Sequence, residues 1–186
     1  FIGDSLTQGA STYDGDDLSG SEKLHWTNVI CEYFAEKTGK RVNLYNAGVG
    51  GTQTSFVAKM VSQTAEDKNA DIVFIENVND LNTNTTNSQK WTENLVRSLS
   101  KLDKKPVVIL AHAISPFQER DTNGDSVKTV AEGKEWQIQH ANAKDVVAKA
   151  YNLASVDYIS YYYDNTNGFD TNSDWMQEDY GPSKIA

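Results

Sequence analysis

The runs Asp71-Ile72-Val73-Phe74-Ile75 and Pro106-Val107-Val108-Ile109-Leu110 decide the fold. Each is a short, continuous apolar stretch, which is typical of a strand that is covered on both faces of a parallel sheet. Residues 42–45 and residues 156–159 have similar strand-like patterns. Phe1-Ile2 would be the last part of another strand. The sequence therefore predicts a sheet that is mostly parallel.

Amphipathic stretches separate these runs. In each of them apolar side chains recur at spacings of three and four residues, as one face of a helix requires. The four stripes are Trp26, Val29, Ile30, Tyr33 and Phe34; Phe56, Val57, Met60 and Val61; Trp91, Leu95, Leu99 and Leu102; and Ile138, Val146, Val147, Ala150 and Leu153. Strands that alternate with helices predict right-handed βαβ units, and hence an α/β fold with three α/β/α layers.

Length and charge narrow the possible classes of protein. The chain has 186 residues and a formal net charge of −9, from 17 Lys and Arg against 26 Asp and Glu. We expect one domain over 1–186, cut from a longer protein, because the chain opens on apolar residues without an initiator Met. The negative charge, without a basic cluster, argues against nucleic acid or an anionic membrane as partner. No apolar run approaches the ~18–20 residues of a membrane span.

Functional side chains of a parallel sheet gather beyond the carboxyl ends of its strands. The predicted stretches are 3–9, 46–54, 77–86, 111–120 and the residues after 160. The first reads Gly3-Asp4-Ser5-Leu6-Thr7-Gln8-Gly9 and exposes a serine at a tight turn. A serine becomes a nucleophile when a base takes its proton and donors hold the oxyanion that forms. The alternative is an ordinary Gly/Ser turn.

The next two stretches contain candidate oxyanion donors. Asn46-Ala47-Gly48-Val49-Gly50-Gly51-Thr52 leaves backbone N–H groups open to a ligand, either a phosphate or an oxyanion, although no P-loop signature follows. Asn77-Val78-Asn79-Asp80 places a side-chain amide at a strand end, where its N–H groups can donate to an oxyanion. The alternative for this stretch is an Asn/Asp turn.

In order and spacing, these three stretches resemble the blocks of the GDSL esterase/lipase family, also called SGNH hydrolases. The resemblance implies a flavodoxin-like three-layer fold, Ser5 as the nucleophile and oxyanion donors from Ser5, Gly51 and Asn79. Asn77 stands where the family usually has glycine. The resemblance also implies a small ester as substrate, with acetylated carbohydrate as the expected class, and a secreted or extracellular bacterial location.

The family's fourth signature, Asp-x-x-His near the C-terminus, is incomplete. Three registers of the tail offer the pairs Ser173 and Met176, Asp174 and Gln177, or Glu178 and Gly181. Asp174 is the candidate orienting acid, but no register supplies a histidine, because the last one is His140. Neither Met nor Gln can accept the serine proton. The base has been lost, or a substitute acts, or the chain binds a ligand without cleaving it.

His112 is the candidate substitute base, because it follows the second apolar run at the expected active edge; the alternative is an ordinary structural histidine. His25 and His140 are expected to be surface or packing residues. Asp4 and Asp80 lie near the expected site but would be poor bases for a serine.

We expect no cofactor and no metal. Residues 121–125 and 164–174 resemble parts of calcium loops, but both lack an essential ligand position. Cys31 is expected in the core, without a partner for thiol catalysis. Aromatic residues near the C-terminus suit either sugar rings or ordinary packing. These are Tyr158, Tyr161, Tyr162, Tyr163, Phe169 and Trp175.

The predicted function is therefore a serine esterase, and the competing hypothesis is a binding module of the same fold. The missing histidine favours the binding module. The intact nucleophile and oxyanion blocks favour the enzyme, because a domain that had lost its activity would have no reason to keep them.

Overall fold

The computed structural model describes residues 1–9, 25–114 and 130–165. Its five strands form one parallel sheet in the order β2-β1-β3-β4-β5. The strands are β1 (Ile2–Gly3), β2 (Ala47–Gly48), β3 (Ile72–Glu76), β4 (Val107–His112) and β5 (Ala154–Asp157). The two long apolar runs of the sequence are β3 and β4, as predicted.

Helical segments connect the strands. They are α1 (Ser5–Gln8), α3 (Trp26–Thr38), α4 (Thr54–Val57), η3 (Ala58–Met60), η4 (Ser62–Glu66), η5 (Val78–Asn82), α5 (Thr85–Ser100), α6 (Val130–Tyr151) and α7 (Tyr158–Asn165). The predicted α/β class is confirmed: helices cover both faces of a parallel sheet.

The larger core lies between the sheet and the layer that contains α4, α5 and α6. Side chains of β1, β3 and β4 that point to this face pack against part of each predicted stripe of these helices, but Phe56 and Val146 of those stripes are exposed. The buried members are Ile2, Val57, Val61, Ala65, Val73, Ile75, Leu95, Val96, Leu99, Val108, Leu110, Val147 and Ala148. This rigid layer supports one side of the sheet's carboxyl edge.

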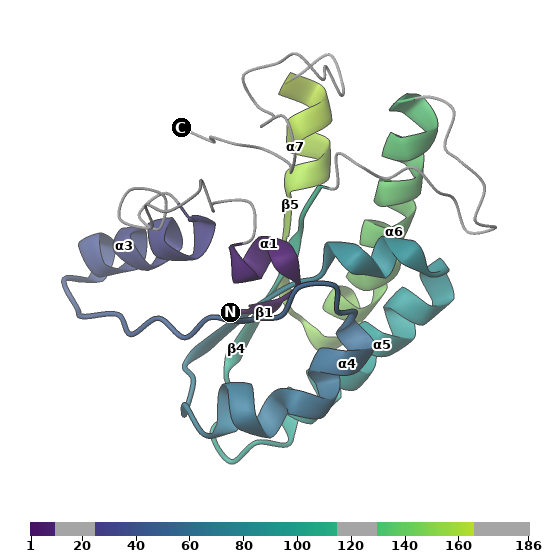
Figure 1. Ribbon diagram of the computed structural model, residues 1–186. Coiled ribbons are helices and arrows are strands. Elements are labelled where there is room, and N and C mark those ends of the chain that lie inside the picture. Colours follow the sequence, from purple (N-terminus) through teal and green to yellow (C-terminus); the bar gives the residue numbers. More distant parts are fainter. Residues whose placement is uncertain (10–24, 115–129, 166–186) are drawn as a thin grey trace.

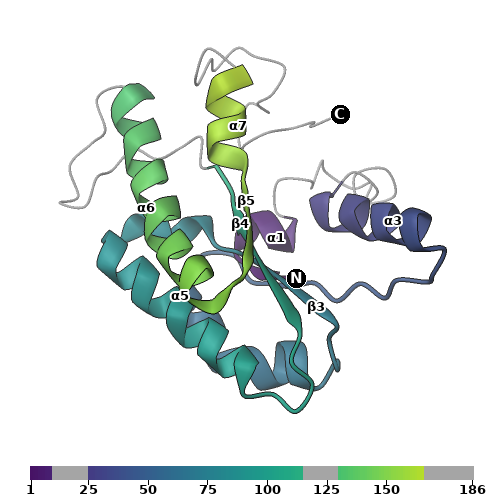
Figure 2. The same cartoon turned by 180° about the vertical axis from the view of Figure 1, so that it is seen from behind.

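Helix α3 lies on the other face, away from α5 and α6 (Figures 1 and 2). The Phe1 ring stacks on Phe74 of β3 with centroids 4.9 Å apart and meets Trp26 of α3 edge-on at 5.1 Å. The predicted stripe of α3 is only partly buried, because Val29 and Tyr33 are 48% and 57% exposed. This face is therefore covered less completely than the other.

Two strand boundaries differ from the prediction. Residues 42–45 form no strand; pairing with β1 begins at Ala47, which lies opposite Ile2. Of that stretch, Tyr45 contacts the residue before β1, because its carbonyl oxygen accepts a hydrogen bond from the Phe1 nitrogen at 2.8 Å. The last strand ends at Asp157, whose carboxylate accepts hydrogen bonds from Ser160 N at 2.9 Å and Oγ at 2.6 Å and so begins α7.

Candidate active site

Ser5 is the first residue of α1, just beyond the end of β1. The Asp4 side chain caps this short helix by accepting a hydrogen bond from the Leu6 N–H at 3.1 Å. Gly3 has no room for a side chain, because a Cβ there would lie 2.1 Å from the Thr7 hydroxyl oxygen. The sharp change from strand to helix leaves Ser5 half-buried at the carboxyl edge of the sheet.

The glycine-rich stretch lies directly against α1. A Cβ at Gly48 would be 2.3 Å from the Gln8 backbone nitrogen, so only glycine allows β2 and α1 to approach. The Gly50 N–H donates to Gln8 Oε1 at 2.7 Å, and a Cβ on Gly50 would lie 3.6 Å from the Ser5 Cβ. Gly51 follows with φ of +74°, and its N–H has no partner among the described residues. An unpaired backbone donor therefore lies one residue from the contact with Ser5.

The third stretch is joined to the same turn by a backbone bond. The Asn79 N–H donates to Asp4 Oδ2 at 2.7 Å. The Asn79 side-chain nitrogen is buried, yet it has no hydrogen-bond partner within the described ranges. An unsatisfied buried donor costs about 1–3 kcal/mol, so native structures rarely keep one without a use. The structure thus brings Ser5, Gly51 and Asn79, which are far apart in the sequence, to one edge.

Asn77 and Asp80 lie on either side of Asn79 and attach it to the start of α4. The fully buried Asp80 carboxylate accepts from Thr54 N at 2.9 Å and from Thr54 Oγ1 at 2.6 Å. The Asn77 amide, with its oxygen and nitrogen assigned from this network, donates to Thr52 O at 2.9 Å and accepts from Thr54 N at 3.1 Å. An asparagine in place of the family's glycine therefore adds a link between the second and third stretches.

A second carboxyl group is buried beneath the serine turn. Glu76 accepts from Thr7 Oγ1 at 2.7 Å and from Val78 N at 2.7 Å. Complete burial, together with the nearby negative charge of Asp4, raises the pKa of Glu76 to about 8. Burial also raises the pKa of Asp4, although the hydrogen bonds that it accepts from the Asn79 and Leu6 N–H groups lower it. At neutral pH the Glu76 carboxyl is therefore mainly protonated.

His112 is the last residue of β4, at the predicted edge, but its side chain lies on the α6 face. Its Nε2 is 2.8 Å from Asp145 Oδ1 of α6. Burial lowers its pKa, against the opposing effect of Asp145. The strand register places His112 two strands from β1, or about 10 Å at ~4.8 Å per strand. The structure does not bring His112 beside Ser5, and its role as a base stays a prediction.

His25 lies closer to the serine turn than the sequence suggested. The ring is buried, with Nε2 3.0 Å from the Leu6 carbonyl oxygen and Nδ1 2.7 Å from Thr27 Oγ1. Because a carbonyl can only accept, Nε2 carries the proton. Both ring nitrogens are occupied, so His25 supports the residue after Ser5 and has no free lone pair for the serine proton.

His140 of α6 is also buried and meets Ser88 Oγ with its Nδ1 at 2.8 Å. Burial, more than the positive charge of Lys144, lowers its pKa to about 4. Ser88 is fully buried, so this serine–histidine pair is inaccessible to an ester. Both His25 and His140 are packing residues, one of the two roles expected from the sequence.

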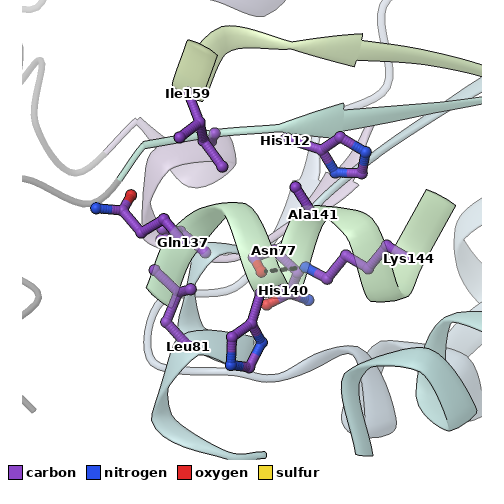
Figure 3. Close-up of a pocket in the computed structure, with 10 residues that line it drawn as sticks. Asn77, Leu81, His112, Gln137, His140, Ala141, Lys144 and Ile159 are labelled. Carbon is purple, nitrogen blue, oxygen red and sulfur yellow. Dashed lines mark hydrogen bonds between the residues drawn. The ribbon is translucent and has the colours of Figure 1, made fainter. Parts of the chain in front are cut away.

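A small cavity of about 10 Å³, roughly the space that one water molecule needs, lies between η5, the end of β4 and α6 (Figure 3). Lys144 of α6 reaches along it toward Asn77. Its Nζ donates to Asn77 O at 2.9 Å and lies 3.2 Å from Asp80 Oδ2. Lys144 is not among the residues predicted from the sequence, because it belongs to no motif and comes from a distant helix.

Several expectations fall outside the described residues. These include Asp174, the alternative positions of the missing histidine, residues 121–125, and Phe169 and Trp175 of the aromatic set. Within the described ranges no group of three or more His, Cys, Asp or Glu side chains could hold a metal ion. None of the helices that the structure describes is long and apolar enough to cross a membrane.

Comparison with known proteins relates the chain to one enzyme family. The sequence pattern of the GDSL-like Lipase/Acylhydrolase family matches residues 1–182. A two-domain esterase described as active on acetylated mannans superimposes with a TM-score of 0.69 and 27% identity. The alignment covers 98% of this chain but only 43% of that esterase.

Two more distant structures have the same fold. The SGNH-hydrolase family esterase AlinE4 is 16% identical, with a TM-score of 0.66 over 96% of this chain and 82% of its own. A G-D-S-L family lipolytic protein from Veillonella parvula DSM 2008 is 19% identical, with a TM-score of 0.63 over 97% of this chain and 86% of its own. No curated protein matches the chain in sequence.

Proposed function

Because the chain belongs to the GDSL-like lipase/acylhydrolase family, an esterase family, we propose that it removes small acyl groups from esters with Ser5 as the nucleophile. The observation that carries the proposal is the buried, unpaired Asn79 Nδ2 beside the serine turn. Among the residues that the structure describes this donor lacks an acceptor, and an ester carbonyl that becomes an oxyanion would supply one.

The proposed reaction has two steps. Ser5 Oγ attacks the ester carbonyl while its proton passes to a base, and the oxyanion accepts hydrogen bonds from Ser5 N, Gly51 N and Asn79 Nδ2. The C–O bond of the ester then breaks, and the alcohol leaves with a proton. Water hydrolyses the acyl-enzyme and restores the serine. The base is the unassigned part, with His112 as the candidate from the sequence.

Acetylated carbohydrate is the substrate class that we propose. The support comes from the two-domain esterase, which is described as active on acetylated mannans and was also crystallised with mannopentaose. A small acetyl group also suits a serine that is half-buried between α1 and the glycine-rich stretch.

A binding module remains the second candidate. One specific observation favours it: no histidine follows His140, so the Asp-x-x-His signature has no base. Such a domain would hold the acylated ligand at the same edge without turnover, because serine is a weak nucleophile until its proton is removed.

Hydrolysis of p-nitrophenyl acetate by the parent and by Ser5→Ala tests the proposal. We expect turnover in the parent and its loss in the variant. Equal rates for the two proteins would overturn the serine mechanism. Met176→His and Gln177→His extend the test, because a restored base is expected to raise kcat over the parent at pH 7–8.

A further inference from the structure

We propose that Lys144 is a positioning residue that holds Asn79 in the orientation needed for the oxyanion. This inference rests on the proposed function, since it gives Asn79 a reaction to serve. Lys144 does not reach the reacting atoms itself; it acts through the backbone on both sides of Asn79.

Lys144 contacts residues on both sides of Asn79 in the sequence. Its Nζ donates to the carbonyl of Asn77, two residues before Asn79, at 2.9 Å. The same Nζ lies 3.2 Å from Oδ2 of Asp80, the next residue after Asn79. Figure 3 shows the lysine extending from α6 toward Asn77. One ammonium group therefore holds the segment of η5 that carries the unpaired amide.

The Asn79 N–H donates a short bond to Asp4 Oδ2 at 2.7 Å, but the other bonds that the backbone carbonyls at the start of η5 accept are long. The Asp80 N–H donates to Asn77 O at 3.4 Å, much longer than the 2.9 Å of the lysine bond to the same oxygen. The Asn79 carbonyl accepts only a long 3.5 Å bond, from Gln53 Nε2. The short charge-assisted bond from Lys144 is therefore the main restraint on Asn77 O.

The ion pair between Lys144 and Asp80 is largely shielded from water. The side chains of Lys144 and Asp80 are 14% and 1% exposed, so the pair is screened far less than a surface pair. The Asp80 carboxylate also accepts two bonds from Thr54, one on each oxygen. These partners restrict the geometry of the Lys144–Asp80 pair, as positioning the neighbouring Asn79 requires.

Helix α6 gives the lysine a rigid base. Val147 and Ala148, on the next turn, are 2% and 4% exposed in the main core. Two turns earlier, Trp136 Nε1 donates to the Leu81 carbonyl of η5 at 3.1 Å. The helix therefore contacts η5 and the residue before it at two places, and these contacts restrain the position of the Lys144 side chain relative to Asn79.

A double-mutant cycle on kcat for p-nitrophenyl acetate tests the proposal. Its members are the parent, Lys144→Met, Asn79→Ala and the double variant, with Lys149→Met as an exposed lysine control on the same helix. We expect Lys144→Met to lower kcat by about tenfold to a hundredfold with little change in KM, since a displaced group costs rate. In the Asn79→Ala background the same change should lower kcat less than about threefold, because the residue through which it acts is gone.

An equal loss in both backgrounds would overturn the proposal, because it would show that Lys144 supports the fold and not Asn79. A falling kcat in Lys149→Met would count against it for the same reason. Lys144→Met leaves a buried carboxylate unpaired, so the pair Lys144→Met with Asp80→Asn keeps the test usable if the single variant does not fold. In that pair kcat should stay low although no unpaired charge remains; a return to the parent kcat would contradict the proposal.

The side-chain amide signal of Asn79 in a ¹⁵N-correlated NMR spectrum separates this inference from the proposed function. Its absence in Asn79→Ala identifies the signal. We expect it to move or broaden in Lys144→Met and to stay unchanged in Lys149→Met. This readout needs no turnover: an inactive parent would refute the esterase proposal, whereas an unmoved amide signal would refute the role of Lys144.

Discussion

Asp80 and Thr54 are joined by two short hydrogen bonds, from the Thr54 backbone nitrogen at 2.9 Å and from its hydroxyl at 2.6 Å. Asp80 is the last residue of the third stretch, and Thr54 lies two residues after the second. This link ties the segment after β3 to the start of α4. The site is therefore held together beneath its surface by buried polar contacts.

Asn79→Ala should separate activity from stability. We expect kcat for p-nitrophenyl acetate to fall about 10²–10³-fold, the usual effect of removing one oxyanion donor. The free energy of unfolding should stay the same or rise by up to ~1 kcal/mol, because the variant removes a buried nitrogen that has no partner among the described residues. Urea unfolding and initial rates on the same samples measure both. A clear loss of stability with unchanged kcat would assign Asn79 to the fold instead.

Gly48→Ala should disrupt the contact between β2 and α1. The new methyl would lie 2.3 Å from the Gln8 backbone nitrogen, so one of the two elements must shift. We expect a loss of stability of about 2 kcal/mol or more, within the range of overpacking. Gly39→Ala is the matched control, because Gly39 has a φ of +64° but open space around a Cβ. It should cost only ~1 kcal/mol. Equal losses in the two variants would mean that the approach at Gly48 is not tight.

Glu76→Gln should flatten the dependence of stability on pH. The pKa of Glu76 is raised from 4.5 to about 8, so the folded protein binds this proton more tightly than the unfolded chain. The corresponding stability is complete below pH 4.5 and is lost as the pH rises toward 8. Glutamine keeps an acceptor for Val78 N and a donor for Thr7 but cannot ionise. Urea midpoints at pH 5, 6, 7 and 8 should fall more steeply in the parent than in the variant. Parallel curves would show that Glu76 does not titrate in this range.

His112→Gln should retain most of the esterase activity. The Asp145 contact occupies His112 Nε2, and the ring lies on the α6 face, about 10 Å from β1 by strand spacing. We therefore expect kcat to change less than about tenfold, whereas loss of a catalytic base typically removes several orders of magnitude. The ascending limb of the pH profile is the second readout. A loss of kcat as large as that of Ser5→Ala, together with loss of that limb, would make His112 the base.

The sheet was predictable where a single run of residues carries the signal. β3 and β4 are continuous apolar runs, and a strand covered on both faces has no other common pattern. The expected strand at 42–45 was wrong because pairing with β1 begins only at Ala47, and no local pattern records where a partner strand lies. In the same way, the end of β5 is set by the side chain of Asp157, which begins the next helix.

The candidate site was predictable only as far as its three stretches. The positions of Ser5, Gly51 and Asn79 follow from strand ends that meet at one edge. Lys144 could not be found in this way, because a lysine in an amphipathic helix usually faces solvent. Its importance comes from contacts with Asn77 and Asp80, more than sixty residues away, and those exist only in the folded chain.

The place of β1 between β2 and β3 has a consequence for the order of events during synthesis. Every strand that pairs with β1 is made after it, and β3 ends only at Glu76. Domains generally fold as units during synthesis, and here β1 must wait for two strands that are made after it. The serine turn therefore forms only after β3 has been made. A nascent chain halted before Lys144 should lack a finished site even if its first strands have paired.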